Sequence, residues 1–141
     1  MIVILNLNMA VDKTFYIPDF EKGLTFRANP DLSIAGGKGV NVARVLKNFT
    51  DDYILLGACL GFNGMFIRKK LSEEKIKNRM VFEKSGESRV CVSVIDGNGV
   101  STDLNEEGCV VKRKTLDALM AVIKKKIAVA TALCVSGRSV K

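Results

Sequence analysis

Short apolar runs alternate with stretches of helical periodicity along the chain. Residues 2–7 and 132–136 are nearly continuous apolar runs, typical of strands that are buried on both faces of a sheet. Shorter strand-like runs cover residues 14–17, 53–56 and 80–82, and Gly57 is expected to close the second of these. Helical spacing predicts helices over residues 39–48, 63–75 and 114–127. This alternation predicts an α/β fold with a mostly parallel sheet flanked by helices.

A hairpin interrupts the alternation. The strand-like residues 89–95 and 100–104 enclose Asp96-Gly97-Asn98-Gly99, and Asp-Gly and Asn-Gly supply the positive-φ residues that tight turns need. The extended chain before Gly36 does not fit the alternation either. We expect these segments, about residues 13–34 and 87–106, to form a small β lid near the ligand edge of the sheet, within one domain of residues 1–141.

The most informative stretch is the loop Gly36-Gly37-Lys38-Gly39 at a predicted helix start. Free backbone N–H groups and the helix dipole favour an anion there, and glycine lets the backbone approach a ligand closely. Lys38 adds a positive charge, and Asn41 can hydrogen-bond hydroxyl groups. The loop predicts a phosphate or sugar-phosphate site. The alternative is an ordinary glycine turn with a solvated lysine.

The helix after this loop is expected to bury one side, formed by Val42, Val45, Leu46 and Phe49 at helical spacing. The loop itself is neither a Walker A motif nor a dinucleotide-binding motif. Leu32 stands where Walker A requires its first glycine, and Val42 stands where the dinucleotide motif requires its third.

Asp12 is expected just beyond the carboxyl end of the first strand, where open α/β sheets bind their ligands. A turn-forming or capping role is the alternative reading of an aspartate at this place.

Composition narrows the possible functions further. The chain has 141 residues, a net charge of +7, four scattered cysteines and no histidine. Reduced thiols, and the lack of a leader or a membrane-length apolar run, favour a cytoplasmic protein. The runs of lysine and arginine flank the regularly spaced apolar residues of a predicted helix, as the charges of a solvated helix face do. Few aromatic residues accompany these runs. Nucleic-acid binding is therefore a minor alternative, and no nucleic-acid partner is expected.

Three segments resemble the ribokinase/PfkB sugar kinases. They are Leu-Asn-Leu-Asn-Met-Ala-Val-Asp at residues 5–12, Ala-Gly-Gly-Lys-Gly-Val-Asn-Val-Ala-Arg at residues 35–44, and Gly-Glu-Ser-Arg at residues 86–89. The lysine among the glycines resembles the phosphosugar branch, which contains 1-phosphofructokinase and tagatose-6-phosphate kinase. The resemblance extends to about residue 137.

The resemblance implies substrate-binding roles for eight residues, namely Asp12, Arg27, Gly36, Gly37, Lys38, Asn41, Arg89 and Ser136. Asp12 and Asn41 would bind sugar hydroxyls, and the two glycines would let the backbone press against the sugar. Lys38 and Arg89 would bind the phosphate that the substrate already carries. Arg27 resembles a residue that reaches the substrate from the lid, across a dimer interface, and Ser136 begins a conserved family turn.

The chain departs from the family pattern at several positions. Met9, Glu107 and Cys109 stand where prolines are usual, and the sequence diverges from Arg138 onward. The family's Gly-Ala-Gly-Asp motif, which carries the catalytic base, is absent, so no catalytic residue is assigned and the C-terminal half of the fold is expected to be missing.

The resemblance therefore implies the N-terminal portion of a kinase that uses ATP and Mg²⁺. The intact enzyme would phosphorylate fructose 1-phosphate or tagatose 6-phosphate, and this chain alone would be inactive. A homodimer through the β lid is expected. A non-catalytic sugar-phosphate binding module remains the alternative.

Overall fold

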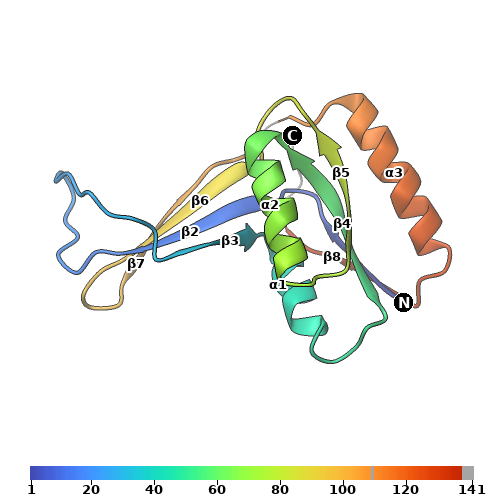
Figure 1. The fold of residues 1–141 in the computed structure, drawn as a ribbon, viewed down its shortest axis with the longest axis horizontal. Coiled ribbons are helices and arrows are strands. Elements are labelled where there is room, and N and C mark those ends of the chain that lie inside the picture. The colour runs from blue at the N-terminus through green and yellow to red at the C-terminus, as the bar shows by residue number, and fades with distance from the viewer. Residues whose placement is uncertain (109, 138–141) are drawn as a thin grey trace.

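A computed structural model describes residues 1–108 and 110–137. Its elements, in chain order, are β1 (Ile2–Asn6), β2 (Ala10–Tyr16), β3 (Leu32–Gly36), α1 (Lys38–Leu46), β4 (Tyr53–Leu60), α2 (Gly61–Glu73), β5 (Asn78–Glu83), β6 (Arg89–Ile95), β7 (Ser101–Asn105), α3 (Arg113–Ile127) and β8 (Ala132–Val135). They form one parallel sheet with helices and a second, smaller sheet (Figure 1). None of the described helices is long and apolar enough to cross a membrane.

The main sheet has the strand order β5-β4-β1-β8, and all of its pairings are parallel. β1 lies inside the sheet, so that Ile2 pairs with Tyr53 of β4 on one side and with Ala132 of β8 on the other. The α/β fold with a mostly parallel sheet is confirmed. The apolar runs explain this arrangement, because parallel strands covered on both faces need apolar side chains on both faces.

Successive side chains of β1 enter two different cores. Ile4 packs with residues of α1 and α2, whereas Val3 and Leu5 pack with Leu119 and Ile123 of α3. The period of two along a strand therefore places α1 and α2 on one face of the sheet and α3 on the other (Figure 1).

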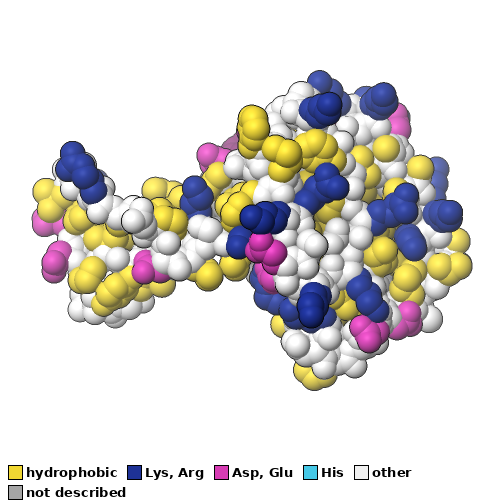
Figure 2. Space-filling view, viewed as in Figure 1, with side chains coloured by type: hydrophobic (Ala, Val, Ile, Leu, Met, Phe, Trp, Pro, Cys, Tyr) yellow, Lys and Arg dark blue, Asp and Glu magenta, His cyan; other side chains and the backbone are white. Residues whose placement is uncertain are grey.

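The second sheet, of order β3-β2-β6-β7, projects from the body as an arm (Figure 1). β2 and β6 pair in parallel at its centre, and each pairs with an antiparallel neighbour, β3 or β7. The predicted hairpin is confirmed: the Asp96 carboxylate accepts the N–H groups of Asn98 and Val100, and Gly99 has a φ of +79°. Several large apolar side chains on the arm are exposed, namely Tyr16, Leu24, Leu32, Val100 and Leu104 (Figure 2).

Two strand predictions are wrong in detail. β4 does not end at Leu56 but continues through Gly57 to Leu60, because Gly57 packs closely against the β1 backbone, where a side chain would collide with the Asn6 carbonyl oxygen. β8 is not buried on both faces: as an edge strand of the sheet it leaves Leu133 and Val135 exposed.

The predicted apolar side of the first helix is also partly wrong. Val42 and Leu46 pack on the core, but Val45 is exposed and Phe49, three residues beyond the end of α1, is 80% exposed. The residues of α1 that are fully covered are instead the small Gly39, Val40 and Ala43, because the helix lies close against the sheet.

Candidate functional site

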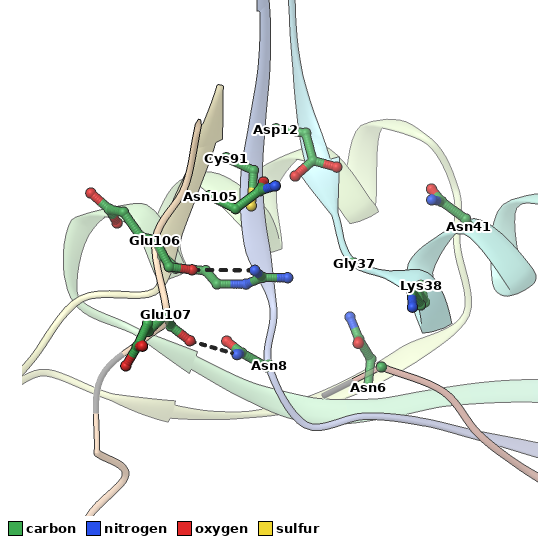
Figure 3. A pocket seen from close by; sticks show the side chains of 12 residues that line it. Asn6, Asn8, Asp12, Gly37, Lys38, Asn41, Cys91, Asn105, Glu106 and Glu107 are labelled. Atoms are coloured by element: carbon green, nitrogen blue, oxygen red, sulfur yellow. Dashed lines mark hydrogen bonds between the residues drawn. The ribbon is translucent and has the colours of Figure 1, made fainter. Parts of the chain in front are cut away.

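A hollow of about 500 Å³ opens where the arm meets the body (Figure 3). It is bounded by the ends of β1 and β7, by the bases of β2 and β6, and by the start of α1. Its lining residues are Asn6, Asn8, Asp12, Gly37, Lys38, Asn41, Arg89, Cys91, Asn105, Glu106, Glu107 and Gly137. Five residues that the sequence predicted for substrate binding, Asp12, Gly37, Lys38, Asn41 and Arg89, therefore lie around one cavity.

Helix α1 begins at this hollow. Gly37 precedes its first turn with a φ of +116°, a conformation that favours glycine, and its backbone N–H donates a hydrogen bond to the Asp12 carboxylate. Lys38 follows with an exposed side chain that makes no ion pair within the described part of the chain. An unpaired ammonium at a helix N-terminus is a favourable place for an anion.

Asp12 faces Lys38 and Asn41 across the hollow (Figure 3). The structure corrects its predicted position, because Asp12 lies within β2 and pairs with Cys91 of β6. Burial raises the pKa of the Asp12 carboxyl, while the nearby Arg89 and Arg44 cations and a hydrogen bond from the Cys91 thiol oppose that rise. A half-buried carboxylate of this kind can accept hydrogen bonds from sugar hydroxyls.

Arg44 orients Asn41. Its Nη1 donates to Asn41 Oδ1 at 2.8 Å, which leaves the Asn41 amide nitrogen available as a donor. The same guanidinium donates to both carboxylate oxygens of Glu74, at 2.6 and 3.0 Å, and to the Ala35 carbonyl at 2.8 Å. One side chain thus links the first helix, the end of β3 and the C-terminus of α2.

Arg89 enters the hollow from the first position of β6. Its Nη1 donates to the Glu106 carbonyl oxygen at 3.3 Å, while its Nε is buried and has no hydrogen-bond partner in the part of the chain that the structure describes. The residues before it are fixed at the start of α2: the Glu87 carboxylate accepts the N–H groups of Phe62 and Asn63, and Ser88 Oγ accepts the N–H of Leu60. A partly satisfied guanidinium held by a rigid base suits an oxyanion ligand.

The other three predicted residues do not line the hollow. Gly36 is buried behind it, where a Cβ atom would overlap the Asp12 carboxyl group, so glycine is required for that close approach. Arg27 is exposed in the loop between β2 and β3. Ser136 donates its backbone N–H to the Leu5 carbonyl at 3.1 Å, and its neighbour Gly137 lines the hollow instead. The predicted departure at Arg138 lies outside the described residues, as does Cys109.

Sequence reasoning missed six lining side chains, namely Asn6, Asn8, Cys91, Asn105, Glu106 and Glu107. Two of them carried a usable signal, because Asn6 and Asn8 are polar residues next to a buried strand end. Asn8 donates to the Glu107 carbonyl oxygen at 2.9 Å and so joins the first loop to the end of the arm (Figure 3). The others reach the hollow only through the pairing of β6 with β2 and β7.

The hollow carries charges of both signs. Lys38 and Arg89 provide cations, and Asp12, Glu106 and Glu107 provide carboxylates. This mixture is suited to a ligand with both an anionic group and hydroxyls. Within residues 1–108 and 110–137, no group of three or more His, Cys, Asp or Glu residues could hold a metal ion.

The fold and the hollow together define a ribokinase-like α/β protein with a polar ligand site beside a β arm. Residues 6–141 match the model of the pfkB family of carbohydrate kinases, and the chain belongs to that family.

Two groups of relatives are similar in sequence. The chain is 33% identical over 114 residues to a tagatose-6-phosphate kinase of Staphylococcus epidermidis, which covers 81% of this chain and 36% of that protein. It is 32% identical over 120 residues to the 1-phosphofructokinase of Bacillus subtilis, covering 85% and 39%. The chain therefore spans less than half the length of these relatives.

Solved structures show the same arrangement. A possible 1-phosphofructokinase of Thermotoga maritima superimposes with a TM-score of 0.86 at 26% identity, covering 99% of this chain and 45% of that one. The Escherichia coli phosphofructokinase-2 in complex with fructose-6-phosphate gives a TM-score of 0.83 at 20% identity, covering 97% and 45%, and supports the fold alone.

Proposed function

We propose that the hollow binds a phosphorylated ketohexose. Lys38 and Arg89 would bind its phosphate, while the Asp12 carboxylate and the Asn41 amide nitrogen would bind its hydroxyls. The observation that carries this proposal is the arrangement of the hollow, in which the Lys38 ammonium, without an ion pair to any described residue, and a partly satisfied guanidinium share one cavity with a half-buried carboxylate. Charged hydrogen bonds to a phosphate are the strongest that such side chains make.

For the whole protein we propose an ATP-dependent phosphosugar kinase. The names of the relatives point to fructose 1-phosphate or tagatose 6-phosphate as substrate. Among the described residues, no group of three or more His, Cys, Asp or Glu side chains could hold a metal ion, and no transfer step is assigned to these residues. Because the chain spans less than half the length of these relatives, we expect it by itself to bind substrate weakly and to transfer no phosphoryl group.

We further propose that two copies associate through the arm. Its four short strands carry exposed apolar side chains on both faces, Tyr16 and Leu32 on one and Leu104 on the other, and a small sheet of this kind gains stability when such side chains are covered. In such a dimer Arg27, which lies outside the hollow of its own chain, would be brought towards the hollow of the other copy.

Calorimetric titration of the 141-residue chain with fructose 1-phosphate, tagatose 6-phosphate and unphosphorylated fructose tests the binding site. We expect dissociation constants near the millimolar range for the two phosphates, equivalent to about −4 kcal/mol, and no measurable binding of fructose. Equal affinity for fructose and its phosphate would show that the hollow does not recognise phosphate.

The catalytic proposal needs a second protein, in which this chain is joined to the C-terminal half of a PfkB kinase. We expect ADP release with the phosphosugar from the joined protein and none from the 141-residue chain. Binding without transfer by the joined protein would favour a non-catalytic binding module. Transfer by the short chain at the rate of the joined protein would refute the expected inactivity.

A further inference from the structure

Asn6 is a buried polar residue at the bottom of the hollow that the proposed site does not yet use. It ends β1, is only 1% exposed, and points its amide toward the cavity beside Lys38 (Figure 3). Its neighbours in β1 are all apolar, and a leucine would serve equally well for packing alone. An amide at this position therefore requires an explanation.

The Asn6 side chain is incompletely hydrogen-bonded. Its nitrogen Nδ2 donates to the Met9 sulfur at 2.9 Å, and thioether sulfur is a weak acceptor. Its oxygen Oδ1 is buried and has no hydrogen-bond partner among the described residues. Nearly all buried polar atoms in folded proteins have a partner, because burying an unpaired acceptor costs stability. The Oδ1 atom is thus a buried acceptor without a partner among these residues, on a side chain that lines the hollow.

Three glycines keep the surroundings of this amide free of other side chains. A Cβ atom on Gly37 would collide with Asn6 Nδ2, and one on Gly39 would lie 2.7 Å from Asn6 Cβ. A Cβ atom on Gly137 would lie 3.3 Å from Oδ1. The glycine loop that begins α1 therefore leaves room for the Asn6 amide as well as for a ligand.

We propose that Asn6 Oδ1 accepts a hydrogen bond from a hydroxyl group of the bound sugar phosphate, which makes Asn6 a specificity residue. The inference rests on the proposed function of the hollow. An amide oxygen cannot bind a phosphate oxygen, because both are acceptors, so this buried acceptor requires a donor such as a hydroxyl. The Arg89 Nε, in contrast, is a buried donor without a partner in residues 1–108 and 110–137, and it requires an acceptor. A ligand that satisfies both atoms carries an oxyanion and a hydroxyl group.

The test compares two probes with the same charge, fructose 1-phosphate and hexyl phosphate, which has no hydroxyl groups. They are titrated into the wild-type 141-residue chain and into Asn6→Leu, Asn6→Asp and Asn78→Leu. Leucine has nearly the shape of asparagine and no polar atom. Asn78 is the matched control, since it lies on β5 outside the hollow and its amide is satisfied by the Ile76 carbonyl at 2.8 Å.

We expect Asn6→Leu to weaken fructose 1-phosphate binding about threefold to tenfold, as the loss of one hydrogen bond does, and to change hexyl phosphate binding less than twofold. Asn6→Asp places a negative charge beside the ligand and should weaken both probes. The thermal midpoint of free Asn6→Leu should equal or exceed that of the wild type, because the variant removes an unpaired buried acceptor. Asn78→Leu should change neither affinity.

Three results would overturn the proposal. Equal losses of the two probes in Asn6→Leu, together with a lowered thermal midpoint, would show that Asn6 only supports the fold. Unchanged binding of fructose 1-phosphate in Asn6→Leu would show that no hydroxyl contacts Asn6, while leaving the proposed phosphate site intact. Failure of the wild-type chain to bind either probe would refute the proposed function and this role together.

Discussion

Arg44→Met should destabilise the protein more than any exposed ion-pair substitution, although Arg44 is expected to make no contact with the phosphate. Methionine retains most of the aliphatic stem but removes the whole guanidinium. The Glu74 carboxylate then loses both of its hydrogen bonds from Arg44, at 2.6 and 3.0 Å, and the Ala35 carbonyl loses the one at 2.8 Å.

The structure sets the magnitude of this effect between two limits. Removing one partner of a fully buried ion pair costs about 3–5 kcal/mol, whereas exposed pairs are worth about 0.2–1 kcal/mol. Arg44 and Glu74 are 27% and 22% exposed, so the pair lies nearer the buried limit but is partly screened by water. We expect the free energy of unfolding to fall by about 2–3 kcal/mol, which a domain of ordinary stability tolerates.

Urea unfolding followed by far-UV circular dichroism measures this loss. Arg113→Met is the matched control, because Arg113 Nε also binds one carboxylate, that of Asp117 at 3.0 Å, but both side chains are mostly exposed. The control should lose no more than about 0.5 kcal/mol. The double variant Arg44→Met/Glu74→Gln should recover part of the loss, since it leaves no unpaired carboxylate.

A loss in Arg44→Met that is no larger than the loss in Arg113→Met would refute this account of the ion pair. The same variant also tests the role of Asn41, whose Oδ1 loses its donor. Without urea, where the variant is fully folded, its affinity for fructose 1-phosphate should still fall. The reason is that the Asn41 amide, once the Arg44 guanidinium is removed, can rotate away from its donor orientation.

Three further predictions concern the hollow and the arm. Lys38→Ala should weaken fructose 1-phosphate binding about tenfold to a hundredfold, as the loss of a charged hydrogen bond does, and calorimetry should show much less change for hexoses without phosphate. Burial raises the pKa of Asp12 above its ordinary 3.8. Between 3.8 and the raised pKa, the folded chain therefore binds more protons than the unfolded chain, and the free energy of unfolding falls as pH rises through that window. Asp12→Asn should flatten this slope in urea unfolding, and an unchanged slope would contradict the assignment. Light scattering at tens of micromolar should show a dimer that Leu104→Lys converts to monomer, and a monomeric wild type would refute the arm interface.

Much of the fold followed from local patterns. The continuous apolar run of β1 and the Asp-Gly-Asn-Gly turn specify their structures through nearby residues only, so the parallel sheet and the hairpin were predictable. The exposure of Val135 was not predictable, because it depends on which strand lies at the edge of the sheet. The extension of β4 past Gly57 depends likewise on a close approach to a distant strand.

The residues of the site likewise include some that the local sequence predicts and others that only the three-dimensional fold brings together. Gly37, Lys38 and Asn41 lie close together in the sequence at a predicted helix start, and an anion site is expected at such a place. Cys91 and Glu106 reach the hollow only because β6 pairs with β2 and β7, and no local signal marks either residue. Asn6 could have been noticed as a polar residue at the end of a buried strand, but its unpaired oxygen is visible only in three dimensions.

The central place of β1 has a consequence for how the chain assembles during synthesis. Its residue Ile2 is synthesised before both of its partners, Tyr53 of β4 and Ala132 of β8. β1 can therefore pair with β4 well before β8 has been synthesised, and its second edge stays open until then. The hairpin of β6 and β7 needs only neighbouring residues and can form at once. Because long loops must close before the sheet is complete, the nascent chain has a long interval in which chaperones would bind residues 2–7.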